Sequence, residues 1–144
     1  MTAQTSREPV RVQITEGPGY LRADLYNRRT PEETRTFLNE VAAECVKRRL
    51  FRLLIFVHSS KPMFTVEKYG FSSYADLAAK HSGRIALVTD SVECCIAQDY
   101  VALLARLRGA NVRTFRESAA AIRWLIDRTE SRDTAKGPAT QPLP

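Results

Sequence analysis

The run Leu53-Leu-Ile-Phe-Val57 decides the fold of this 144-residue chain. Five consecutive apolar residues are typical of a central β-strand that is covered on both faces. Gly83 introduces a second run of the same kind, Arg84-Ile-Ala-Leu-Val-Thr89. The sequence therefore predicts at least two core strands, separated by a segment long enough to cross over from one to the other.

Two alternating segments precede these core strands. Val10, Val12 and Ile14 alternate with polar residues, and residues 20–26 alternate again with an apolar set on one side. The turn Glu16-Gly-Pro-Gly19 separates them. The period of two predicts strands, and the short turn predicts that they form an antiparallel hairpin.

Helices are predicted between the strands from their start signals. Thr30-Pro-Glu-Glu33 combines a hydroxyl cap, an early proline and a glutamate three residues after the cap, so a helix is expected over residues 31–48. Asp90 with Glu93 matches the same capping box and predicts a helix that closes at Gly109. We expect its buried stripe to be the following residues: Val92, Ile96, Tyr100, Leu103, Leu104 and Leu107.

The rest of the chain completes an alternating order. A helix is expected over about residues 72–80, a strand over residues 112–115 and a last helix over about residues 119–126. The order β-β-α-β-α-β-α-β-α predicts an α/β fold with a mixed, mostly parallel five-stranded sheet, an antiparallel N-terminal hairpin and about four helices. We expect one domain over residues 9–128, a flexible leader over residues 1–8 and a disordered tail over residues 129–144.

Composition narrows the class of protein. The chain is 44% hydrophobic and 26% charged, as in ordinary globular domains, with a net charge of +6. That charge suits anionic partners, but the basic residues are dispersed and lack interleaved aromatics, so nucleic acid is not the expected partner. No segment predicts a membrane span or a signal peptide, and a cytoplasmic protein is expected. Cys45, Cys94 and Cys95 have no metal-ligand spacing, and no motif predicts a metal or another cofactor.

The core strand Arg84-Ile-Ala-Leu-Val-Thr-Asp90 and the segment Val112-Arg-Thr-Phe-Arg-Glu-Ser-Ala-Ala-Ala-Ile-Arg-Trp-Leu125 resemble the SpoIIAA-like family of small bacterial proteins. This family is grouped with STAS domains and with the lipid-binding CRAL-TRIO fold. The resemblance covers about residues 9–127 and implies helices packed on a mixed sheet, with no established enzymatic activity. It also implies a regulatory module that binds partner proteins, nucleotides or small anions.

Some STAS domains are switched by phosphorylation of a serine in an Asp-Ser-Ser/Thr-Gly motif after the central strand. The corresponding region here reads His58-Ser-Ser-Lys-Pro-Met63, which lacks that motif. Ser59, Ser60, Ser72 and Ser73 are the acceptors that a switch of this kind would use.

Polar residues follow both core strands, and parallel sheets place their ligands beyond the carboxyl ends of the strands. The candidates for ligand binding or modification are therefore His58, Ser59, Ser60, Asp90 and Ser91. No nucleophile elbow is present, so no catalytic residue is assigned. A strand end that merely reaches solvent, with a serine capping the next turn, is the alternative interpretation.

The aromatic group Phe64, Tyr69, Phe71 and Tyr74 also has two interpretations. These residues form either a cover for the edge of the sheet or a lid over a pocket for a small apolar or anionic, lipid-like molecule. The sequence thus favours a non-enzymatic STAS-like module that binds an unknown protein partner or small ligand, with a ligand carrier and a serine-phosphorylation switch as alternatives. A homodimer is compatible with the same pattern.

Overall fold

The structure is a computed structural model, and it describes residues 9–62, 76 and 79–127. Five strands form one sheet in the order β1-β2-β3-β4-β5. β1 is antiparallel to β2, and all the other neighbouring pairs are parallel, as the sequence predicted. The strands are β1 Arg11–Gly17, β2 Tyr20–Tyr26, β3 Arg52–His58, β4 Arg84–Thr89 and β5 Asn111–Phe115.

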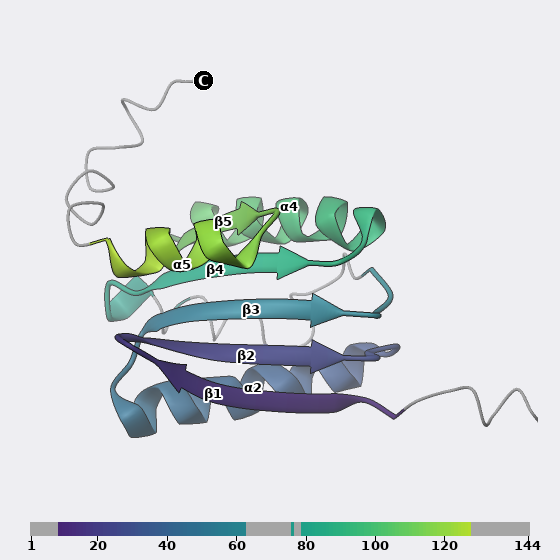
Figure 1. The fold of residues 1–144 in the computed structure, drawn as a ribbon, viewed down its shortest axis with the longest axis horizontal. Helices are drawn as coiled ribbons and strands as arrows, with labels where there is room; N and C mark the ends of the chain where they lie inside the picture. The colour runs from purple at the N-terminus through teal and green to yellow at the C-terminus, as the bar shows by residue number, and fades with distance from the viewer. Residues whose placement is uncertain (1–8, 63–75, 77–78, 128–144) are drawn as a thin grey trace, which may run out of the picture.

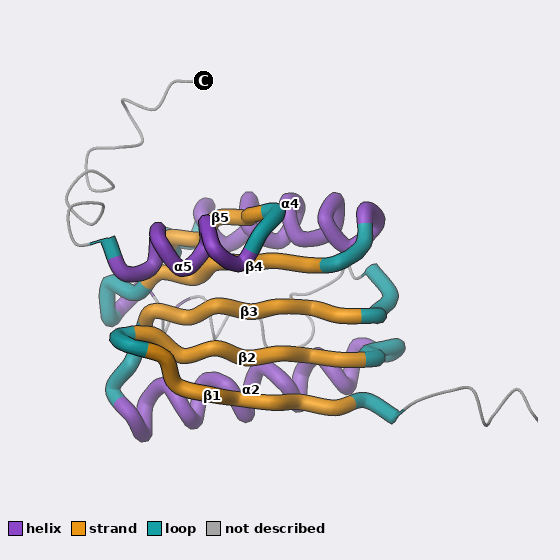
Figure 2. The backbone as a smooth tube through the Cα atoms, in the orientation of Figure 1, coloured by secondary structure: helices purple, strands orange, loops and turns teal. Residues whose placement is uncertain are grey.

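Three helices in the described part of the chain cover the sheet. α2 Pro31–Arg48 and α4 Val92–Leu107 pack on one face, and α5 Ser118–Ile126 packs on the other, over β3, β4 and β5 (Figure 1). None of these helices lies over β1 and β2 on the α5 face (Figure 2). Most of the additional helix expected over residues 72–80 lies outside the described residues.

The start of α2 follows from its sequence. The Thr30 hydroxyl accepts a hydrogen bond from the Glu33 N–H, and the Glu33 carboxylate accepts one in return from the Thr30 N–H. The predicted capping box and the predicted bounds of this helix are both confirmed. Pro31 at the first helical position contributes a fixed backbone angle and lacks the N–H that would otherwise need a partner.

The core has two parts, one on each face of the sheet. β2, β3 and β4 send alternate apolar side chains to each face, as their period of two requires. The larger part lies beneath α2 and α4 and contains Leu21, Leu25, Phe37, Val41, Leu53, Ile55 and Val112 among others. The smaller part lies beneath α5 and contains Leu54, Ala86, Val88, Trp124 and Leu125 among others.

The predicted buried stripe of α4 is wrong. Small or polar residues face the sheet instead: Cys94, Ala97, Gln98, Ala102 and Ala105. Because alanine side chains are short, they let the helix approach the sheet closely. The large residues Val92, Ile96, Tyr100, Leu103 and Leu107 are exposed, while Leu104 is partly buried.

The predicted cap of α4 is also wrong by one residue. Ser91 is the N-cap, and its hydroxyl accepts a hydrogen bond from the Cys94 N–H at 3.0 Å. The Asp90 carboxylate accepts from the Ser59 N–H instead, at 3.2 and 3.3 Å to its two oxygens. Asp90 therefore joins the ends of β3 and β4 and does not cap the helix.

Candidate functional site

The carboxyl ends of β3 and β4 lie side by side, as the parallel register requires. The contact between the Ser59 N–H and the Asp90 carboxylate joins these ends, and both residues are exposed. Ser59 has a φ of 49°, in the left-handed region, so the chain turns sharply where β3 ends. Of the predicted candidates, these two are therefore brought together at the rim of the sheet.

Ser60 and Ser91 use their hydroxyls within the backbone framework. The Ser60 hydroxyl accepts from the Arg28 N–H at 3.0 Å and donates to the His58 carbonyl at 2.9 Å. The Ser91 hydroxyl caps α4. Ser60 thereby ties the loop after β2 to the loop after β3.

His58 points away from these serines, onto the α5 face of the sheet. Its Nε2 lies 2.8 Å from Oδ1 of Asp24. The two oxygens of the Asp24 carboxylate also accept hydrogen bonds from the Arg22 guanidinium, at 2.9 and 3.1 Å. Burial alone would raise the pKa of Asp24, but the hydrogen bonds from Arg22 and His58 outweigh burial and lower it. Asp24 is therefore held as a carboxylate in a nearly dry position.

Aromatic rings flank this polar group. The His58 ring stacks between Tyr26 and Phe56, with ring centroids 4.3 and 4.0 Å away, and the Arg11 guanidinium lies 4.0 Å from the centre of the Tyr26 ring. The faces of the His58 ring therefore contact Tyr26 and Phe56.

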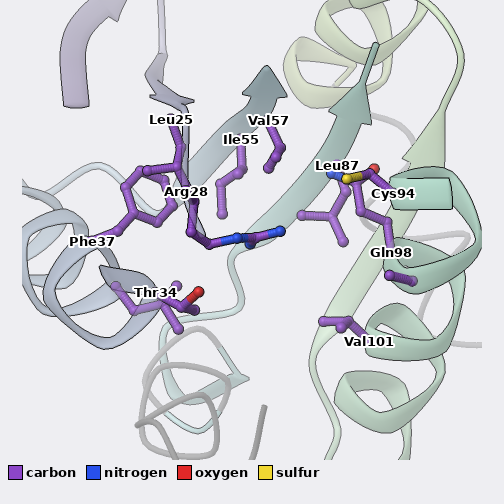
Figure 3. Close-up of a pocket in the computed structure, with 12 residues that line it drawn as sticks. Leu25, Arg28, Thr34, Phe37, Ile55, Val57, Leu87, Cys94, Gln98 and Val101 are labelled. Carbon is purple, nitrogen blue, oxygen red and sulfur yellow. The ribbon is translucent and has the colours of Figure 1, made fainter. Parts of the chain in front are cut away.

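A cavity of about 80 Å³ lies on the opposite face of the sheet, between α2 and α4. The described residues that line it are mostly apolar: Leu25, Phe37, Leu38, Ile55, Val57, Leu87, Ala97 and Val101, together with Arg28, Thr34, Cys94 and Gln98. Figure 3 shows the Arg28 side chain extending from the loop after β2 into the space between the two helices.

Arg28 is the unusual member of this lining. Its side chain is buried, with 7% of the residue exposed. One terminal nitrogen donates to the Lys61 carbonyl, and Nε has no hydrogen-bond partner among the described residues. Burial lowers the pKa of Arg28, yet a guanidinium stays charged at neutral pH. The cavity therefore holds a buried cation that forms no ion pair with any described carboxylate.

A second buried polar atom in the same lining has no partner among the described residues. This atom is the Thr34 hydroxyl oxygen, on the first turns of α2. Two other polar side chains of the lining are occupied: Gln98 Nε2 donates to the Val88 carbonyl at 3.0 Å, and the Cys94 thiol donates to the Ser60 carbonyl at 3.1 Å. The free bonding capacity of the cavity is thus concentrated on Arg28 and Thr34.

Sequence reasoning did not find Arg28, Thr34 or Asp24. Arg28 sits in a short polar loop, Asn27-Arg-Arg-Thr30, where an exposed arginine is the ordinary expectation. Asp24 falls on the polar side of the alternating β2 pattern, which indicated a wet face. The expected lid residues Phe64, Tyr69, Phe71 and Tyr74 lie outside the described residues.

Among the described residues, no group of three or more His, Cys, Asp or Glu side chains is placed to hold a metal ion. In the same part of the chain, no helix combines the length and the hydropathy needed to cross a membrane.

The mixed sheet, with its antiparallel first strand and helices on both faces, defines a STAS-type α/β domain. The family model described as SpoIIAA-like matches residues 21–126, from the second strand to the end of the last helix. The chain therefore belongs to the SpoIIAA-like family. No curated protein and no solved structure matches it.

Proposed function

We propose that this chain is a regulatory ligand-binding module and that its ligand is a small amphipathic anion. The apolar part of the ligand occupies the cavity between α2 and α4. Its carboxylate or phosphate group binds the Arg28 guanidinium and accepts a hydrogen bond from the Thr34 hydroxyl. The module binds this ligand without transforming it.

The observation that carries this proposal is the buried charge of Arg28, which forms no ion pair with any described carboxylate and whose Nε has no hydrogen-bond partner among the described residues. Removing a guanidinium from water costs several kcal/mol unless an anion and further hydrogen bonds compensate it. Among the described residues, the hydrogen bond to the Lys61 carbonyl supplies only part of that compensation. A bound anion would supply the rest, with the two-pronged geometry for which arginine is suited.

The rest of the lining supports an amphipathic ligand over a simple inorganic ion. Of the twelve described lining residues, eight are apolar, and burying the alkyl part of a ligand contributes about 0.8 kcal/mol for each CH₂ group. Apolar walls with a few convergent polar groups are the usual composition of small-molecule sites.

Other features support a binding role in place of a catalytic one. His58 and its partner Asp24 lie on the face of the sheet opposite the cavity, so the imidazole cannot act on a ligand held by Arg28. Cys45, Cys94 and Cys95 form no disulfide, which suits the reducing cytoplasm, where we place the protein.

The serine-switch alternative has a narrower basis. The hydroxyls of Ser60 and Ser91 already form framework hydrogen bonds. Ser59 is exposed, but a phosphate there would lie beside the Asp90 carboxylate and be repelled by it. Ser72 and Ser73 lie outside the described residues.

The experiment is calorimetric titration with straight-chain carboxylates from butanoate to decanoate, with the matching alcohols as neutral probes. We expect carboxylates to bind more tightly as the chain lengthens, up to the length that the cavity holds. Arg28→Met should weaken carboxylate binding at least tenfold, because a charged hydrogen bond is lost, and should leave alcohol binding within about twofold.

Two control variants make the result specific. Ala97→Phe fills the cavity and should abolish binding of both probe series. Arg52→Met removes a half-buried arginine outside the cavity lining and should leave both series unchanged. Undiminished carboxylate binding by Arg28→Met, or no binding of any probe by the parent chain, would overturn the proposal.

A further inference from the structure

α4 carries apolar residues on two opposite sides. Its inner side packs on the sheet and lines the cavity through Cys94, Ala97, Gln98 and Val101. Its outer side carries large exposed residues: Val92 at 73%, Ile96 at 58%, Tyr100 at 42%, Leu103 at 47% and Leu107 at 75% exposure. We call these five residues the α4 stripe. They make up most of the large exposed hydrophobic residues in the described part of the chain, the others being Val46 and Ile126.

The α4 stripe is continuous along the helix. Its members are spaced by four, four, three and four residues, so at 100° per residue they fall within an arc of about 80°. This is the narrow apolar seam that helices use to pair with other helices. A contiguous apolar surface about 20 Å long marks a site of association in a protein of this size.

The spacing of the α4 stripe is symmetric about the middle of the helix. Val92 and Leu107 are equidistant from that midpoint, as are Ile96 and Leu103, while Tyr100 lies beside it. In an antiparallel pair of identical helices related by a two-fold axis, each residue would lie opposite the residue at the same distance on the other side of the midpoint. Val92 of one copy would meet Leu107 of the other, and the two Tyr100 rings would meet at the axis. Such a self-complementary patch is what an isologous dimer requires.

The helix dipoles favour the same arrangement. Antiparallel pairing places the positive first turn of one helix beside the negative last turn of the other. An anionic membrane would instead favour a uniformly basic flank, whereas Asp99 and Glu93 both border the α4 stripe.

We propose that the α4 stripe is the interface of a two-fold symmetric homodimer, in which the α4 helices of two copies pack antiparallel. This proposal stands on the outer side of α4 and is independent of the ligand site on its inner side. Loss of ligand binding by Arg28→Met and loss of dimerisation through the α4 stripe are therefore separate results.

Sedimentation equilibrium of the full chain over a wide concentration range tests the dimer. The parent chain should be dimeric, and Leu103→Glu should weaken association at least a hundredfold, because the change buries two like charges near the axis. Since Leu103 is half exposed, the variant should keep its helical circular dichroism. The matched control is Val46→Glu, on the exposed surface of α2, which should remain dimeric.

Cysteine cross-linking tests the antiparallel geometry in a Cys95→Ser background. With molecular oxygen as the oxidant, Tyr100→Cys should form a disulfide with itself. Val92→Cys and Leu107→Cys should each remain uncross-linked alone and form a mixed disulfide together. Self-cross-linking of Val92→Cys alone would indicate parallel helices and contradict the proposal.

Two other results would overturn the proposal. The first is a parent chain that is monomeric at every concentration and floats with vesicles of phosphatidylglycerol and phosphatidylcholine, which would assign the α4 stripe to a membrane surface. The second is a Leu103→Glu variant that stays dimeric, which would place the interface elsewhere on the molecule.

Discussion

Two buried arginines at opposite ends of the sheet are held in different ways. Arg84, at the start of β4, is 2% exposed, donates to the Trp124 carbonyl at 2.5 Å and lies over the Trp124 ring. Arg28, beyond the end of β2, is 7% exposed, and its Nε has no partner among the described residues. Both are buried cations, but only Arg84 binds the negative end of a helix.

The difference separates a residue whose charge stabilises the end of a helix from one whose charge forms no ion pair with any described carboxylate. The last carbonyls of α5 need donors, and Arg84 supplies them while its charge favours the helix dipole. Among the described residues, the Arg28 guanidinium donates only to the Lys61 carbonyl. Removing the two charges should therefore have effects of opposite sign on the free energy of unfolding.

The largest expected effect is that of Arg84→Met. This change keeps the length of the side chain but leaves the carbonyls of Trp124 and Leu125 with fewer donors in a buried position. We expect the free energy of unfolding to fall by about 3 kcal/mol. Urea unfolding at a fixed protein concentration measures it.

Arg52→Met is the matched control for this change. Arg52 donates to the same Leu125 carbonyl at 2.6 Å, but it is only half buried. We expect a loss of about 1 kcal/mol. A loss for Arg84→Met no larger than that of the control would show that burial does not strengthen this contact.

Arg22, which pairs with the Asp24 carboxylate, gives an intermediate case. Asp24→Asn removes the charge that binds Arg22 and His58, and at pH 7 it should cost about 2 kcal/mol. The pKa of Asp24 is lowered below its ordinary value of 3.8, so the unfolded chain takes up the proton first as the pH falls. The stabilisation should be complete well above pH 4 and lost as the pH falls through the lowered pKa.

Urea unfolding between about pH 2.5 and pH 7 measures this dependence. The stability of the parent chain and of Asp24→Asn should converge at the acid end. For the control Glu40→Gln, on the exposed surface of α2, the free energy of unfolding should depend on pH as it does in the parent chain. If the difference in free energy of unfolding between the parent chain and Asp24→Asn is the same at every pH, the charge of Asp24 does not contribute to stability.

The smallest expected effect on stability is that of Arg28→Met. Arg28 is a buried charge that forms no ion pair with any described carboxylate, so replacing it by an apolar side chain of similar length should leave the free energy of unfolding unchanged or raise it by about 1 kcal/mol. Arg28→Lys should be less stable than Arg28→Met, because an ammonium is more strongly hydrated than a guanidinium. A loss above about 2 kcal/mol for Arg28→Met would place Arg28 in the same structural class as Arg84.

The fold was largely predictable because its signals are local. The capping box at Thr30 fixes the start of α2, and the apolar runs of β3 and β4 mark strands covered on both faces. The buried side of α4 was not predictable in the same way. Periodicity identifies the side with the large apolar residues, but close packing against the sheet selected the side with the alanines.

The candidate site was predictable only in part, and the reason is geometric. The ends of parallel strands share an edge, so Ser59 and Asp90 were placed together from the sequence. Successive residues on a strand face opposite sides of the sheet. Because β3 continues to His58, this side chain keeps the alternation and faces Asp24. The burial of Arg28 depends on tertiary packing of a loop between two helices, which no local pattern encodes.

The position of α4 has a thermodynamic consequence. The same 16-residue helix forms a wall of the cavity and presents the α4 stripe. If an occupant of the cavity shifts this helix, it must change the affinity between two copies, and dimerisation must change the affinity for the occupant by the same factor. One helix would then convert the filling of a small cavity into a change of assembly state.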